Sequence, residues 1–178
     1  MTVNNGNHIG RIFNGLQAPT NIPWHVKLQV PTPHNDYPFT CSGTILDNIT
    51  ILTTANCVES VIQTSSQYLV FAGVINQWDQ SAQKIPVAKT FVHPQFDEET
   101  YFANIAVLKL KTQIHFQDGV VQPACLPDST FDPIFGGTVV ASGWGATSDQ
   151  NLWIDVPQNL QVYFQERIFA HFLVLTLK

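Results

Sequence analysis

Residues 41–57 read CSGTILDNITILTTANC, and this stretch decides the kind of fold. It holds two runs rich in β-branched and aliphatic residues, Thr44–Leu46 and Ile49–Thr53, with Asp47 and Asn48 between them. β-Branched residues pack well on a pleated surface, whereas Asp and Asn favour turns. The stretch therefore predicts two short strands with a turn between them.

The same pattern recurs along the chain. Five further segments combine strand-forming residues with turn residues at both ends, and none resembles an amphipathic helix: Val26–Val30, Tyr68–Ala72, Ile85–Val92, Ile105–Leu110 and Thr138–Ser142. Short strands separated by Pro, Gly, Asn and Asp favour an antiparallel sandwich or barrel over a parallel sheet. We predict an all-β protein.

Composition excludes several classes of protein. Of the 178 residues, 44% are hydrophobic and 12% charged, which is inconsistent with a disordered chain. The net charge is −5, and the 8 Lys and Arg are scattered along the sequence, so we expect no nucleic-acid or heparin partner. Residues 1–11 contain no apolar signal-peptide segment, and Ile168–Leu177 is too short to cross a membrane. Either a secretion signal lies outside this chain or the protein is cytosolic.

No metal or cofactor site is expected. The three cysteines, Cys41, Cys57 and Cys125, leave one unpaired after any single bridge, and none has the CxxC spacing of a zinc or redox site. The six histidines lie far apart with no HxH or HxxxH pair, which predicts ordinary surface or core residues.

A proline-rich segment divides the chain. Residues 116–135 carry Pro123, Pro127 and Pro133 and few strand formers, which predicts an extended connector over the surface. After it come a glycine-rich strand pattern at 136–145 and a last run at Leu160–Ile168. Two strands cannot close a barrel. The second unit is therefore expected to be incomplete.

Eight phrases along the chain resemble the trypsin-like serine protease family, in order and in spacing. They are Arg11–Gly15 (RIFNG), Pro23–Val26 (PWHV), Cys41–Ile45 (CSGTI), Leu52–Cys57 (LTTANC), Val92–Pro94 (VHP), Asn104–Leu110 (NIAVLKL), Gln122–Pro127 (QPACLP) and Ser142–Gly145 (SGWG). The resemblance implies two antiparallel six-stranded barrels with the active site between them. It implies residues 1–11 as a pro-segment-like N-terminus, 12–120 as a complete first barrel, 121–135 as the connector, and 136–178 as a partial second barrel with an unmatched tail.

The resemblance also locates the catalytic positions, and they are changed here. The family's general-base histidine precedes the second cysteine of its Thr-Ala-Ala-His-Cys phrase, where this chain has Asn56. The orienting aspartate heads the Asp-Ile-Ala-Leu-Leu phrase, where this chain has Asn104. The nucleophile's Gly-Asp-Ser-Gly-Gly phrase does not occur among the 178 residues. A side-chain amide cannot accept and return a proton near neutral pH, so we predict no peptidase activity and no catalytic residues.

Further residues take their expected roles from the same resemblance. It implies a Cys41–Cys57 disulfide, and hence a secreted protein whose signal peptide is not in this chain. Cys125 matches a cysteine bonded to a pro-segment cysteine that is missing here, so we expect it to be free or linked to another chain. Arg11–Ile12 resembles the activation cleavage site, although an exposed arginine before an ordinary strand is an equal alternative.

Asn48-Ile49-Thr50 matches the N-glycosylation sequon, in a turn where a secreted protein could carry a glycan or where the match could be fortuitous.

For function, the sequence favours a non-catalytic protease homologue that binds a protein partner such as a protease or inhibitor, with no membrane partner. Association through the incomplete second barrel is a further expectation. The alternative is a truncated fragment or isoform of a serine endopeptidase homologue with no independent function.

Overall fold

The structure, a computed structural model, is all-β in the parts it describes, which confirms the predicted fold class. It describes residues 16–17, 22–31, 39–58, 68–74, 80–126, 138–143 and 158–163. The strands are β1 (Leu16–Gln17), β2 (His25–Val30), β3 (Phe39–Asp47), β4 (Thr50–Thr53), β5 (Leu69–Ala72), β6 (Gln83–Val92), β7 (Ala106–Leu110), β8 (Thr138–Gly143) and β9 (Gln158–Tyr163). The described helix is a single 3-10 turn, η1 (Ala55–Cys57).

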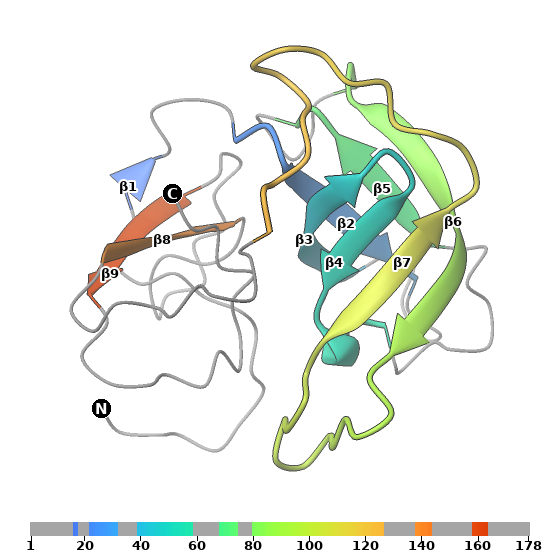
Figure 1. Cartoon of the computed structure of the whole chain (residues 1–178), viewed down its shortest axis with the longest axis vertical. Coiled ribbons are helices and arrows are strands. Elements are labelled where there is room, and N and C mark those ends of the chain that lie inside the picture. Colours follow the sequence, from blue (N-terminus) through green and yellow to red (C-terminus); the bar gives the residue numbers. More distant parts are fainter. Residues whose placement is uncertain are drawn as a thin grey trace.

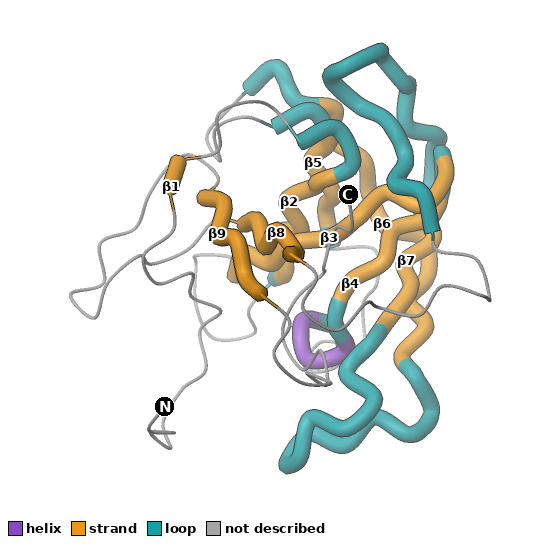
Figure 2. Tube along the Cα trace, turned by 60° about the vertical axis from the view of Figure 1, so that its left-hand side comes forward, coloured by secondary structure: helices purple, strands orange, loops and turns teal. Residues whose placement is uncertain are grey.

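Six strands close into a barrel (Figures 1 and 2). Around the barrel the order is β2-β3-β4-β7-β6-β5, and every neighbouring pair is antiparallel. Closure leaves no unpaired strand edge in the barrel. Of the two architectures that the strand spacing allowed, sandwich or barrel, the first unit is a barrel.

Alternation along each strand fills the interior of the barrel. In β7, Ala106, Leu108 and Leu110 are buried, whereas Val107 and Lys109 between them are only partly buried. Successive side chains of a strand point to opposite faces, so one face of β7 builds the core and the other lies outside.

One glycine is required by close packing between strands β2, β3 and β4. A Cβ atom at Gly43 would lie 2.7 Å from Ile51 Cγ2 and 3.0 Å from Val26 Cγ2. Real Cβ atoms do not approach neighbours this closely, so a residue without a side chain allows the three strands to pack.

The segment after β7 stays attached to the barrel. Its Ile114 and Val121 are buried in the barrel core. The backbone N–H of Gln122 donates to the Pro23 carbonyl at 3.0 Å, and that of Ala124 donates to the Ile45 carbonyl at 2.9 Å. The beginning of the predicted connector therefore packs along the outside of the first barrel.

A smaller sheet contains the remaining described strands, in the order β1-β9-β8 (Figure 1). β8 and β9 are the two strands expected after the connector, and this second unit is a partial one. Leu16–Gln17 lies within the 12–120 range assigned to the first barrel, yet it pairs with β9. The predicted boundaries at residues 12, 121 and 136 stay predictions. In the described part of the chain, no helix has the length and apolar character needed to cross a membrane.

Candidate functional site

The first half of the site is the turn that follows β4. After Thr53 the chain enters η1, closed by a hydrogen bond from the Val58 N–H to the Ala55 carbonyl at 2.9 Å. A disulfide joins Cys57 to Cys41 of β3, with 6.3 Å between the two Cα atoms. The disulfide therefore ties η1 to the barrel and holds Asn56 at the end of β4.

The second half of the site is the turn that precedes β7. Tyr101 and Ala103 both have positive φ angles, 55° and 52°, and the Ile105 N–H donates to the Ala103 carbonyl at 2.7 Å. Non-glycine residues avoid this left-handed region at a cost of about 1–2 kcal/mol each, so the backbone before Asn104 is strained. Such strain persists where the surrounding structure imposes it, and here it directs Asn104 inward, where this residue is buried.

The fold brings Asn56 and Asn104 into direct contact although they are 48 residues apart. The backbone N–H of Asn56 donates to the side-chain Oδ1 of Asn104 at 2.9 Å. The Oδ1 of Asn56 itself is buried and accepts no hydrogen bond. The positions expected for the base and its orienting partner therefore lie side by side, but both side chains are amides.

This pair cannot perform proton transfer. An amide oxygen accepts a hydrogen bond without carrying charge, so Asn104 positions the η1 backbone but supplies no negative field. Asn56 has no nitrogen that could take a proton from a hydroxyl and return it near neutral pH. Chemically, the arrangement is a neutral hydrogen-bonded contact in the place of an acid–base pair.

The other predicted site residues lie elsewhere. Cys125 is exposed and free. Asn48 occupies the turn between β3 and β4, where its backbone carbonyl accepts the Ile114 N–H at 2.7 Å. Arg11 and Ile12 lie outside the described residues. In the described part of the chain, no group of three or more His, Cys, Asp or Glu residues is arranged to hold a metal ion.

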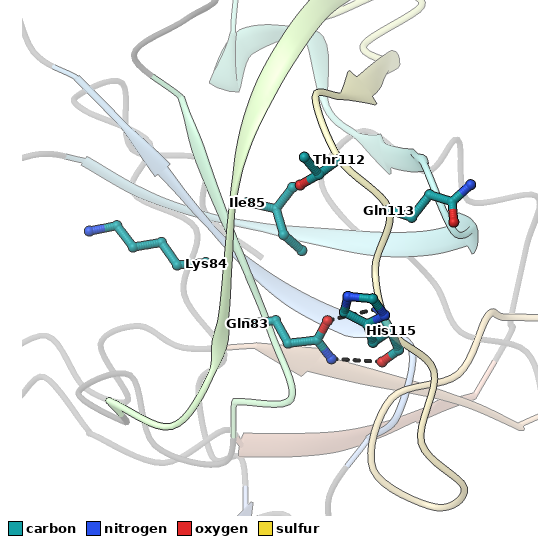
Figure 3. A pocket seen from close by; sticks show the side chains of 6 residues that line it. All are labelled: Gln83, Lys84, Ile85, Thr112, Gln113 and His115. Carbon is teal, nitrogen blue, oxygen red and sulfur yellow. Dashed lines mark hydrogen bonds between the residues drawn. The ribbon is translucent and has the colours of Figure 1, made fainter.

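Three features of the described structure were not predicted. They are the strained turn before Asn104, the burial of His25 in β2, and an open pocket of about 600 Å³ (Figure 3). The pocket lies beside the start of β6, between Gln83–Ile85 and a segment that includes Thr112, Gln113 and His115. The sequence gives little indication of this pocket. Two of its walls are joined by the Gln83 side-chain amide, which hydrogen-bonds to both the N–H and the carbonyl of His115, 32 residues away.

Comparison with known proteins decides the family. The trypsin family model matches residues 12–169, which is most of the chain. The chain belongs to the trypsin family. The expected resemblance is thereby confirmed, and the barrel described above corresponds to that fold.

Individual trypsin-family relatives are distant. The clotting factor G beta subunit of Tachypleus tridentatus is 27% identical over 139 residues, covering 76% of this chain and 44% of that protein. Serine protease 56 of Mus musculus is 30% identical over 140 residues, covering 77% of this chain and 22% of that protein. This trypsin-family chain therefore spans less than half the length of either relative.

A solved structure shows the same fold. The chain described as "Structure of GrC" superposes with a TM-score of 0.76 at 22% identity, covering 87% of this chain and 66% of that one. At this level of identity the similarity is informative about the fold alone.

Proposed function

We propose that this trypsin-family protein is non-catalytic and acts by binding a protein partner, such as a protease or a protease inhibitor. The observation that supports it best is the Asn56–Asn104 contact, in which amides stand where the family has a base and its orienting carboxylate. Hydrolysis in this family requires a general base next to the nucleophile, and neither amide can act as one near neutral pH.

Binding is a function that a folded barrel without a general base can still perform. The barrel keeps a packed core and a disulfide, so it offers a rigid surface for a partner. We further propose that the protein is secreted. A structural disulfide persists in oxidising compartments and is rare in the cytosol, which supports this location.

The activity part of the proposal is tested with serine-directed phosphonate probes and a panel of fluorogenic peptide substrates. We expect no covalent labelling and no turnover, with trypsin as the positive control run in parallel. Stoichiometric labelling of a purified sample, found by intact-mass measurement, would refute the proposal.

A double variant, Asn56→His with Asn104→Asp, restores the family residues at both positions. We expect it to stay inactive as well, because no Gly-Asp-Ser-Gly-Gly phrase occurs among the 178 residues. Turnover by this variant, but not by the parent, would show that a serine elsewhere serves as the nucleophile.

A further inference from the structure

The sequon Asn48-Ile49-Thr50 lies in the turn that joins β3 to β4, and the proposed function does not use it. It is the one Asn-x-Ser/Thr match among the 178 residues. Asp47 is paired with Thr50 across the two strands, so Asn48 and Ile49 form the turn between them (Figure 1). Within these 178 residues, an N-linked glycan can therefore be attached at one asparagine only.

The hydrogen bonds that build this turn do not involve the Asn48 side chain. The Asp47 carboxylate accepts the Ile49 N–H and the Thr50 hydroxyl, both at 2.8 Å. The backbone carbonyl of Asn48 accepts the Ile114 N–H at 2.7 Å. Among the residues that the structure describes, the side-chain amide of Asn48 has no hydrogen-bond partner. This amide is therefore available for another use.

An asparagine in a turn usually has one of two structural roles. Its side chain accepts a hydrogen bond from the backbone two residues on, or its backbone adopts a positive φ, which asparagine tolerates better than most residues. Here Asp47 supplies the first, through the Ile49 N–H. Among the described residues other than glycine, those with a positive φ are Tyr101 and Ala103, so Asn48 is not one of them. The turn does not require an asparagine at position 48, which favours a role for the sequon over a fortuitous match.

The exposure of the three sequon residues also suits a glycan. Asn48 is partly exposed, Ile49 beside it is 37% exposed, and Thr50 is only 6% exposed. Oligosaccharide is transferred to the nascent chain, when the Thr50 hydroxyl is not yet enclosed by the fold. After folding, only the asparagine has to remain at the surface for the bulky sugar to fit. Both conditions are met at this turn.

We infer that Asn48 carries an N-linked glycan, added from an oligosaccharide on a lipid diphosphate. A bond forms between Asn48 Nδ2 and the anomeric carbon of the first sugar, and the bond from that carbon to the diphosphate oxygen breaks. The lipid diphosphate leaves with the bonding electrons, and Nδ2 loses one proton to a base of the transferase. Nothing is oxidised or reduced. The inference rests on the secretion proposed above, because this transfer takes place in the secretory pathway.

A glycan at this turn would restrict where a partner can bind. The Ile114 N–H holds the segment after β7 against the turn, and residues 111–113 of that segment are exposed. A bulky, hydrated sugar keeps other proteins away from the surface that it covers. The protein partner should therefore contact the barrel away from the β3–β4 turn and residues 111–113.

The test expresses the full chain behind an added secretion signal in a eukaryotic host. Intact mass is measured before and after treatment with peptide N-glycosidase in heavy-oxygen water, for protein from the medium and from the cell lysate. The enzyme removes the glycan and converts its asparagine to a labelled aspartate, which peptide mapping locates. Asn48→Gln removes the sequon, whereas Thr50→Ser keeps both the sequon and the hydroxyl that Asp47 accepts.

We expect the parent and Thr50→Ser to lose mass on treatment and to be labelled at position 48, and Asn48→Gln to show neither change. No mass loss in the parent, in medium and lysate alike, would overturn the inference. A mass loss that persists in Asn48→Gln would also overturn it, because the sugar would then be on another asparagine. The phosphonate and substrate assays are independent of this test, so an unglycosylated chain leaves the non-catalytic proposal intact, and a glycosylated chain that is labelled by phosphonates refutes that proposal alone.

Discussion

At position 104 the difference from the family residue is a single atom, since asparagine carries a side-chain nitrogen where aspartate carries an oxygen. The remaining oxygen keeps a structural task, because it accepts the Asn56 N–H at 2.9 Å. Hydrogen bonding to the η1 backbone is therefore retained while the negative charge is lost. Asn104 therefore hydrogen-bonds the η1 backbone without the negative charge that would favour an imidazolium next to it.

Replacing Asn104 by alanine should destabilise the protein. The Asn56 N–H would lose its acceptor in a partly buried place, and such a loss costs about 1–3 kcal/mol. Asn104→Asp keeps an acceptor oxygen and should fold with the same N–H engaged. The measurement is the free energy of unfolding from urea titration.

Asn48→Ala is the matched control for this experiment. Asn48 lies in the turn between β3 and β4 and takes part through its backbone carbonyl, which alanine retains. Its effect should stay within about 0.5 kcal/mol. Equal destabilisation by the two alanine variants would contradict a specific role for the Asn104 side chain.

Among the elements, η1 depends most on a covalent link. The Cys41–Cys57 disulfide spans 16 residues and connects β3 with the turn that carries Asn56. The same segment also contains the β3–β4 turn, where Asp47 accepts the Ile49 N–H at 2.8 Å and the Thr50 hydroxyl at 2.8 Å. The disulfide thus closes a loop whose interior is already ordered by local hydrogen bonds.

Removing this disulfide with Cys41→Ala/Cys57→Ala should lower the free energy of unfolding by about 3 kcal/mol, as expected for a closed loop of this length. Thermal unfolding of the parent and the variant measures the loss. Cys125→Ala is the control, because Cys125 is exposed and outside the disulfide. The prediction fails if the control is destabilised as much as the double variant.

For the whole molecule, one buried histidine makes stability depend on pH. His25 of β2 is 6% exposed, and burial lowers the pKa of its imidazole from 6.5 to about 4. The unfolded chain therefore takes up a proton at a higher pH than the folded protein does. Stability contributed by neutral His25 is complete above pH 6.5 and is lost as the pH falls from 6.5 to 4, by about 3 kcal/mol.

His25→Gln should flatten the curve of unfolding free energy against pH within this window. Urea titrations of the parent and the variant at several pH values measure the slope. The loss of stability that comes from protonating carboxylates should begin at a lower pH than the loss from His25. The Thr100 backbone N–H and hydroxyl, for example, hold the pKa of Asp97 below its ordinary value. An unchanged slope in His25→Gln would show that His25 is not the titrating group.

How much of the fold and of the candidate site could be predicted from the sequence depends on how far apart in sequence the contacting residues lie. The pattern of neighbouring residues indicated both strands and the turn between them, although β3 runs from Phe39 to Asp47, well beyond the predicted Thr44–Leu46. The predicted strand at Leu160–Ile168 shows the opposite case. It overlaps β9 (Gln158–Tyr163), whose pairing with β8 and β1 no local pattern reports, and residues 164–168 lie outside the described part of the chain.

By itself, the sequence determined the all-β class, the family, and the presence of asparagine at positions 56 and 104, because motifs and strand periodicity are local properties of the chain. Only the tertiary structure decided that the two asparagines touch, that His25 is buried, and that Lys27 and Lys84 both lie against the Phe71 ring. The physical reason is that these contacts join segments far apart in sequence: strand register, fixed by hydrogen bonds between strands, decides which strand side chains are neighbours, and it also brings the turns after β4 and before β7 together.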